Sequence, residues 1–173
     1  TGNWSDGSQW SLSSGGSAVG CPPTSADNLY FDQNSFSASD QVVTIDIDNA
    51  ACKNISWSGV TNNPKFDYNS KQLKVYGSFL LNENMIMYRD NTNLIGTASV
   101  TFDSKGKQLG LLRINGPSVS LSSPLILTSS FSCNSGVFTT NNHDVNTGNY
   151  FYISVTQNAT MTINLGTSSI TTA

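Results

Sequence analysis

LKVYG at residues 73–77 and LRING at residues 112–116 follow one pattern, in which two apolar residues flank a basic one and a glycine ends the segment. ISWSG at residues 55–59 repeats this pattern of alternation and glycine. The three glycines are separated by about one and about two units of roughly 20 residues, the length of one turn of a β-solenoid. ASVTF at residues 98–102 is expected to supply the intervening unit. The repeat therefore predicts a coil of short strands.

Further short apolar runs follow these glycines, among them SFLL at residues 78–81 and SVSL at residues 118–121. A strand, a glycine corner and a second strand describe successive faces of one coil. We therefore expect an all-β chain folded as a right-handed parallel β-helix. A β-sandwich is the alternative, because it also has short strands at regular spacing, but its strands need not repeat a glycine at a fixed place.

The composition agrees with a single β domain. The chain has 173 residues, of which 37% are hydrophobic and only 11% are charged, and Glu83 is its only glutamate. Serine, threonine, asparagine and glycine stand where lysine and glutamate are usual, which disfavours amphipathic helices. Because the net charge is -3, we do not expect a basic surface patch that could bind nucleic acid. No run approaches the roughly 20 apolar residues that cross a bilayer, so membrane insertion is not expected.

Residues 1–26 are rich in turn-forming residues and end in CPPT, which cannot form a central strand. We expect this segment to be a cap and residues 27–173 to form the solenoid. Trp4 and Trp10 lie in the cap segment, and their indoles are expected to cover the open end of the coil. Exposed tryptophans could instead form a platform for a sugar ring. No cap is recognised near Ala173, so we expect the chain to continue into further domains.

The three cysteines cannot all pair with one another. Cys21 and Cys52 flank the first strongly β segment and are the expected disulfide, which leaves Cys133 unpaired. Three free thiols buried in the core are the alternative. The chain has no CxxC pair, so a structural zinc site is not expected.

Few residues suggest catalysis. QVVTIDID at residues 41–48 reads as a half-buried strand with Asp46 and Asp48 on one face, about 7 Å apart. Two carboxylates at that spacing could hydrolyse a glycoside, but nothing nearby raises the pKa of either one. Asp27, Asp32, Asp46 or Asp48 could instead contribute to a calcium site, although no DxDxDG loop is present. The expected cofactor is therefore none, with calcium as the alternative.

Two other groups of residues could suggest catalysis. His143 is the only histidine and adjoins Asp144, but no GxSxG elbow accompanies it, so a surface loop position is expected. Arg89, Asp90 and Arg113 could suggest a polysaccharide lyase on a β-helix, with Arg113 acting beside Asp46 and Asp48. We expect no enzyme activity.

Several motifs together resemble the N-terminal region of large surface adhesins and gliding proteins of the Bacteroidota, which are exported by the type IX secretion system. The motifs are GNWSDGSQWS at 2–11, CPPTSADNLYFD at 21–32, VTI at 43–45, ACKNI at 51–55, LKVYGSF at 73–79 and GVFTTNN at 136–142. The resemblance implies a β-helical module exposed on the bacterial surface, with the secretion machinery and further domains of the same chain as partners. It implies structural roles only: Trp4 and Trp10 as cap, Cys21 and Cys52 as bridge, and Asp27 as a turn or calcium residue.

These observations predict an extracellular, non-catalytic adhesin module or spacer that contacts a surface, a glycan or a neighbouring copy. The Ser, Thr and Asn side chains offer many hydrogen-bonding groups with little charge, which suits a neutral polysaccharide. The alternatives are a polysaccharide lyase or glycosidase and a structural subunit that assembles through its open ends.

Overall fold

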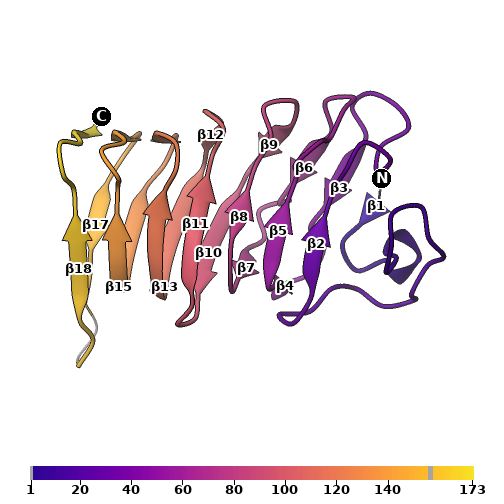
Figure 1. Cartoon of the computed structure of the whole chain (residues 1–173), viewed down its shortest axis with the longest axis horizontal. Coiled ribbons are helices and arrows are strands. Elements are labelled where there is room, and N and C mark those ends of the chain that lie inside the picture. Colours follow the sequence, from indigo (N-terminus) through magenta and orange to yellow (C-terminus); the bar gives the residue numbers. More distant parts are fainter. Residues whose placement is uncertain (1, 156–157) are drawn as a thin grey trace.

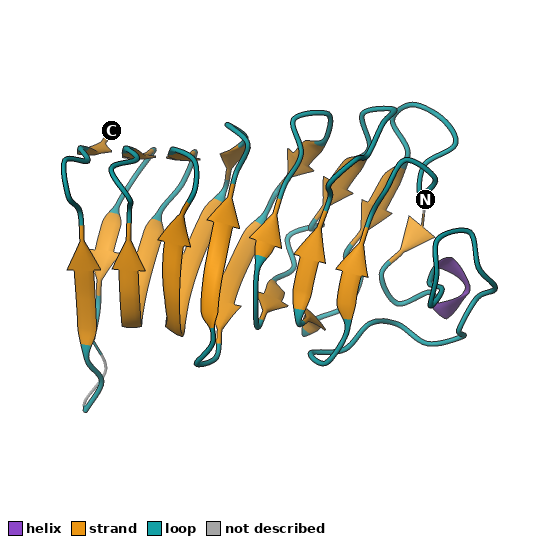
Figure 2. Cartoon of the chain, viewed as in Figure 1, coloured by secondary structure: helices purple, strands orange, loops and turns teal. Residues whose placement is uncertain are grey.

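A computed structural model describes residues 2–155 and 158–173 and shows a parallel β-solenoid of about six turns. The strands stack along the long axis, and the two ends of the chain lie at opposite ends of the molecule (Figure 1). Strands and turns make up nearly all of the described chain, and its one helical element is the 3₁₀ turn Gly7–Gln9 (Figure 2). The expectation of an all-β solenoid is confirmed, and the β-sandwich is excluded.

Each turn of the coil contributes one strand to each of three faces. The first face carries β1 (Gly2–Asn3), β3 (Val42–Thr44), β6 (Lys65–Asp67) and β9 (Ile86–Tyr88), then β12 (Gln108–Leu109), β14 (Leu125–Leu127), β16 (Val145–Thr147) and β19 (Ile170–Thr172). The second face carries β4 (Ala50–Cys52), β7 (Leu73–Val75), β10 (Asn91–Ile95), the first parts of β13 (Leu111–Leu121) and β15 (Phe131–Thr139), and β17 (Phe151–Ile153). The third face, in front in Figure 1, carries β2 (Asn28–Tyr30), β5 (Asn54–Ser56), β8 (Phe79–Leu80), β11 (Ser99–Asp103), the last parts of β13 and β15, and β18 (Met161–Asn164).

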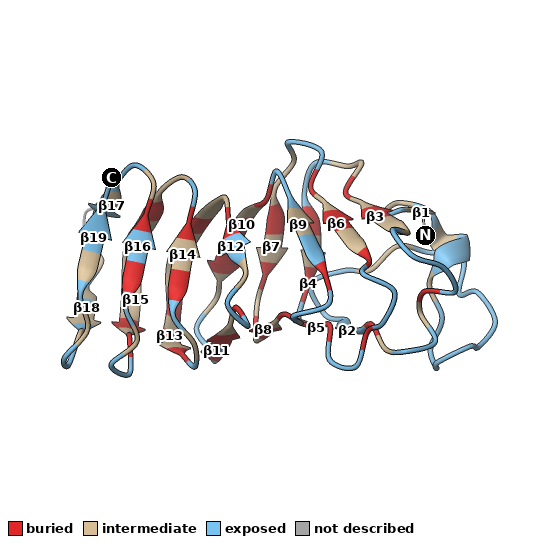
Figure 3. Ribbon diagram, turned by 90° about the horizontal axis from the view of Figure 1, so that it is seen from above, coloured by how far each residue is buried: buried red, intermediate tan, exposed pale blue. Residues whose placement is uncertain are grey.

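The core consists of columns of apolar side chains that repeat from turn to turn. Strand register aligns Cys52, Val75, Leu94, Ile114 and Cys133 behind the second face. It aligns Leu29, Ile55, Phe79, Phe102 and Leu121 behind the third. All of these side chains are buried, and buried residues alternate with more exposed ones along most strands (Figure 3). Burial of such side chains contributes roughly 1.5–3 kcal/mol each, so the columns hold successive turns together.

Glycines form the corner between the second and third faces. Gly96, Gly116 and Gly136 all have positive φ, at 111°, 104° and 99°. A Cβ atom on Gly116 would lie 2.6 Å from the carbonyl oxygen of Gly96, and one on Gly136 would lie 2.3 Å from that of Pro117. The corner therefore needs glycine both for its backbone conformation and for the close approach of neighbouring turns.

The expected phase of the repeat needs one correction. Residues 73–77 and 112–116 do occupy the same face, but residues 55–59 begin in β5 on the third face, and Gly59 lies in the turn beyond it. Residues 98–102 also belong to the third face, in β11. The intervening second-face unit is instead β10 with Gly96. Strands of two faces share the same alternation, so the pattern alone could not separate them.

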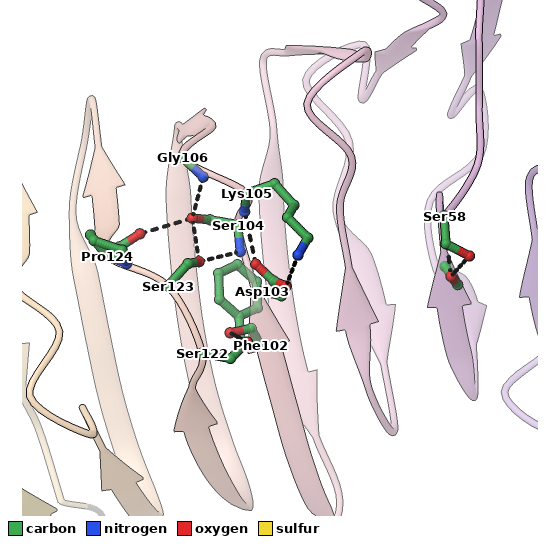
Figure 4. A network of polar contacts seen from close by, with 10 residues as sticks. Ser58, Phe102, Asp103, Ser104, Lys105, Gly106, Ser122, Ser123 and Pro124 are labelled. Atoms are coloured by element: carbon green, nitrogen blue, oxygen red, sulfur yellow. Dashed lines mark hydrogen bonds and ion pairs between the residues drawn. The ribbon is translucent and has the colours of Figure 1, made fainter.

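Ser104 forms a buried polar corner after β11 (Figure 4). Its hydroxyl donates to the carbonyl oxygen of Pro124 at 2.8 Å and accepts from the backbone N–H of Gly106 at 3.2 Å. Ser123 accepts the backbone N–H of Ser104 at 2.9 Å, and the two hydroxyls lie 2.9 Å apart. These bonds satisfy a polar group in the interior and connect consecutive turns.

The N-terminal segment closes one end of the solenoid. Its strand β1 extends the first face beyond β3, and the backbone N–H of Trp4 donates to the carbonyl oxygen of Thr44 at 2.7 Å. The Trp4 side chain is fully buried and stacks on Phe66, with ring centroids 6.2 Å apart. Trp10 is partly buried and meets Trp4 edge-on at 5.3 Å. The two indoles therefore lie over the core of the first turns.

The expected disulfide between Cys21 and Cys52 is wrong, because all three cysteines are free. Cys52 is fully buried in β4 with its side chain in a core column, whereas Cys21 is exposed in the N-terminal segment. Cys133 is buried in the same core column, and burial raises the pKa of both buried thiols to about 12. The two buried cysteines act as small apolar side chains.

Candidate ligand-binding surface

A hollow of about 970 Å³ lies between the N-terminal segment and the first strand of the third face. Its wall includes the aromatic side chains of Trp10, Tyr30, Phe31 and Phe36 and the apolar side chain of Leu12. Concave sites of this size are where proteins commonly bind small molecules.

The aromatic residues of the hollow differ in how they are held. Trp10 donates its indole N–H to the carbonyl oxygen of Trp4 at 3.0 Å and meets Phe31 edge-on at 5.8 Å. Phe31 in turn stacks on Trp57 at 3.9 Å. Tyr30 instead points outward and is 73% exposed. Trp10 is thus fixed by the cap, whereas the ring of Tyr30 is free to stack against a ligand.

Two carboxylates also line the hollow. Asp27 accepts from both the hydroxyl and the backbone N–H of Thr24 at 2.8 Å, and these bonds lower its pKa. Asp32 accepts from the backbone N–H of Asn34 at 2.9 Å, and its pKa is also lowered, mainly through the Ser14 hydroxyl despite partial burial. Both groups are ionised at neutral pH and can accept hydrogen bonds, but neither is poised as a general acid.

A column of uncharged polar side chains leads from the hollow along the outer surface of the third face. Strand register aligns Asn28 with Asn54 near the cap, and aligns Thr101, Ser120, Thr139 and Asn164 further along. The Asn54 side chain donates to Asn28 Oδ1 at 2.6 Å, and Asn164 donates to the Thr139 hydroxyl at 3.2 Å. A parallel column holds Ser99, Ser118, Val137 and Thr162. Side chains in such columns recur about every 4.8 Å, the spacing of neighbouring strands.

The residues considered for catalysis do not meet in one site. The expected strand 41–48 ends at Thr44, so Asp46 and Asp48 lie in the corner before β4 rather than on one strand face. Asp46 accepts from the backbone N–H of Ser5 at 2.9 Å and from its hydroxyl, and Asp48 pairs with Lys71 at 3.0 Å. Partial burial opposes ionisation of Asp46, but the Ser5 bonds lower its pKa overall.

Arg113 lies three turns away from these carboxylates, where it donates to Asn91 Oδ1 at 2.5 Å. Arg89 pairs with Asp67. Its neighbour Asp90 is buried instead, where its carboxylate accepts the backbone N–H of Gly110 at 2.6 Å. An acid, a base and a cation are therefore not gathered from these positions.

His143 lies half-buried in the turn after β15, where its backbone N–H donates to the carbonyl oxygen of Thr140 at 3.0 Å. The adjacent Asp144 accepts the backbone N–H of Ser169 at 2.8 Å. Both residues serve the turn, as expected of a surface loop.

Residues 2–155 and 158–173 contain no group of three or more His, Cys, Asp or Glu side chains placed to hold a metal ion. Asp27 lies before β2, whereas Asp46 and Asp48 share the corner before β4 but have different partners, Ser5 and Lys71. No helix in the described part of the chain is long and apolar enough to cross a membrane.

Sequence reasoning missed Tyr30 as a surface residue. The signal was present, because Leu29 and Phe31 on either side of it are apolar and buried, and alternation then places Tyr30 outside. The hollow itself depends on how residues 8–19 fold back over β2, which no periodic pattern encodes.

Comparisons with known proteins found no matching family model, no matching curated protein and no matching solved structure.

Proposed function

We propose that this domain is a non-catalytic module that binds a neutral polysaccharide, with one sugar residue against Tyr30 in the hollow and the polymer along the third face. The observation that carries the proposal is the continuity of these two features. β2 supplies both the exposed ring of Tyr30 and the first member of the polar column, Asn28.

The chemistry of this surface suits a neutral, hydroxyl-rich ligand. The aromatic ring offers an apolar face to the C–H groups of a sugar, while amide and hydroxyl side chains exchange hydrogen bonds with its hydroxyls. The column from Thr101 to Asn164 contains no charged side chain, so it offers no counter-ion to a uronic acid or a sulfated sugar. Lys105, which lies near the column, is already paired with Asp103.

A binding role also agrees with the state of the carboxylates. Glycoside hydrolysis needs a protonated acid beside a second carboxylate, and the hollow holds two carboxyl groups with lowered pKa. The resemblance to Bacteroidota surface adhesins supports a place for the module on the bacterial cell surface, within a longer exported chain.

The test is affinity electrophoresis and calorimetry of the purified domain against neutral polysaccharides, namely β-glucan, xylan, mannan and galactan, each with calcium and with chelator. A reducing-end assay on every bound polymer measures turnover. We expect binding of at least one polymer, no change with chelator and no release of reducing ends. Binding to none of them, or turnover of any, would overturn the proposal.

Two variant pairs locate the site. Tyr30→Ala should weaken binding about tenfold or more, which corresponds to about 1.4 kcal/mol. Tyr88→Ala removes an exposed tyrosine of the first face and should leave binding unchanged. Thr101→Lys should weaken binding of the polymer but not of a short oligosaccharide, because it interrupts the column away from the hollow. Asn146→Lys on the first face is its matched control.

A further inference from the structure

We propose that the outer surface of the second face binds an acidic polysaccharide, whose uronic acid carboxylates pair with Lys74 and Arg113. This surface is distinct from the hollow and from the polar column of the third face. The inference goes beyond the proposed binding of a neutral polymer and does not depend on it.

The strands of the second face carry positive charge only, although the net charge of the chain is -3. Their segments of β4, β7, β10, β13, β15 and β17 contain Lys74 and Arg113 but no aspartate or glutamate. Two acidic residues lie just before strands of this face, but both are engaged elsewhere. Asp48 pairs with Lys71, and Asp90 is buried with its carboxylate on the backbone N–H of Gly110.

Lys74 and Arg113 are not neutralised by a carboxylate within the described residues. The ion pairs of the described chain use other cations, namely Lys65, Lys71, Arg89 and Lys105. The Lys74 ammonium group instead donates to Asn49 Oδ1 at 2.8 Å, and the Arg113 guanidinium group donates to Asn91 Oδ1 at 2.5 Å. Both cations are only partly buried. The amide oxygens therefore hold the two head groups in place and leave their charges available to a ligand.

The two charges are arranged along the axis of the solenoid. Strand register places Lys74, Asn93 and Arg113 in one column, so the two cations are two strands apart, which is about 10 Å. Asn49 directly precedes β4 and Asn91 begins β10. Both head groups thus lie at the edge of the face where its strands begin. This arrangement fits an extended polymer that crosses the strands.

A carboxylate attached to a sugar is the anion that suits this surface best. A guanidinium group can donate two parallel N–H bonds to a carboxylate, and the Arg113 N–H groups other than the one toward Asn91 have no partner among the described residues. Gln72 and Ser132 lie beside the two cations and offer an amide and a hydroxyl to sugar hydroxyls. Duplex DNA carries one charge per about 1.7 Å, a density that cations about 10 Å apart do not match.

The test is calorimetry of the purified chain with polygalacturonate, in the presence of chelator. The comparison ligands are the same polymer after reduction of its carboxyl groups to alcohols and single-stranded DNA. We expect polygalacturonate to bind and its affinity to fall at least tenfold when salt rises from about 0.1 M to about 1 M, which shortens the Debye length from about 10 Å to about 3 Å. Absence of binding, or binding that does not change with salt, would overturn the proposal. DNA bound as tightly as polygalacturonate would show a general attraction of anions and would also reject it.

Two double variants with the same change in net charge locate the site. Lys74→Gln with Arg113→Gln should weaken binding of polygalacturonate about tenfold or more, with an unchanged circular dichroism spectrum. Lys65→Gln with Lys107→Gln removes two charges near strands β6 and β12 of the first face and should leave this binding unchanged. An equal loss in both variants would assign the effect to net charge and reject the second-face site.

The carboxyl-reduced polymer separates this site from the proposed neutral site of the third face. The Lys74 and Arg113 double variant should bind the reduced polymer as the wild type does, whatever the affinity of the wild type for it. A matching loss for the reduced polymer would show that the two cations do not recognise carboxylates, and it would contradict the proposal.

Discussion

Asp90 is an acidic residue held in the interior of the solenoid. Burial raises its pKa to about 6, although the backbone N–H of Gly110 partly offsets this effect. In the unfolded chain the pKa of an aspartate is about 3.9. Between these values the folded state binds more protons than the unfolded state, so the Asp90 contribution to stability is full below about pH 4 and is lost as the pH rises through about 6.

We therefore predict that Asp90→Asn stabilises the protein at neutral pH. The amide keeps an acceptor for Gly110 and removes a buried charge, so the free energy of unfolding should rise by up to about 3 kcal/mol at pH 7 to 8. This difference should shrink as the pH falls toward 4. Urea unfolding of both proteins at several pH values measures it.

Asp103 provides a control, because its pKa is shifted in the opposite direction to that of Asp90. Burial acts to raise its pKa, but hydrogen bonds from the side chain and backbone of Lys105 lower it overall. Asp103→Asn should therefore destabilise the protein at neutral pH, and the difference should fade as the pH falls below 4. An Asp90→Asn variant whose stability differs from the wild type by the same amount at every pH would contradict the assigned titration.

Single side chains with chemical roles were the least predictable part of the sequence. Alternation along residues 41–48 correctly placed Val43 and Ile45 in the core. It could not show that the strand ends at Thr44, because that depends on pairing with β6 and on the contact between Asp46 and Ser5. The predicted disulfide between Cys21 and Cys52 was wrong for a similar reason. Their positions on either side of a β segment do not show which way the Cys52 side chain points.

At the scale of single elements, the glycine corner makes a sharp prediction. Gly136→Ala combines a backbone with φ of 99° and a Cβ position 2.3 Å from a backbone oxygen of the preceding turn. Neither the added Cβ atom nor the carbonyl oxygen of Pro117 can move without displacing a strand. The free energy of unfolding of the variant should therefore fall by more than about 2 kcal/mol. Thermal and urea unfolding measure the loss.

Gly106→Ala is the matched control, because Gly106 has φ of 72° but no atom within 4 Å of the added Cβ. It should cost only the strain of the left-handed backbone, about 1 to 2 kcal/mol. If the two variants were equally stable, close packing between turns would not be the reason for glycine at position 136.

The elements themselves followed well from the sequence. Leu73, Val75, Leu112 and Ile114 are buried as the alternation requires, and the spacing of roughly 20 residues gave the length of a turn. The error in phase arose at Gly59, which lies in the turn after a third-face strand rather than after a second-face one. Inward and outward positions alternate along the strands of every face, so alternation does not show to which face a strand belongs. Only the pairing of strands between turns distinguishes the faces.

At the scale of the whole molecule, the solenoid is a linear assembly in which each turn contacts only its neighbours. The lack of alternation in residues 1–26 predicted an irregular cap segment, although β1 at Gly2–Asn3 already pairs with β3 on the first face. The sequence could not show the hollow beside Tyr30, since that space is formed by an irregular loop folded over β2. The repeating strands and the tryptophans over the first turns could therefore be predicted, but the path of the irregular segment that forms the hollow could not.

The cap follows from the same linear architecture and gives the last prediction. Trp4→Ala removes a fully buried indole from the end of the core and should cost about 3–5 kcal/mol locally. Because the indole N–H of Trp4 has no hydrogen-bond partner among the described residues, Trp4→Phe should retain most of the stability. The loss should also be confined to one end. Hydrogen exchange followed by mass spectrometry should show faster exchange in β1, β3 and β6 for Trp4→Ala, with β14 and β16 unchanged. Uniformly faster exchange along all turns would mean that the solenoid unfolds as one unit and that Trp4 does not act as a local cap.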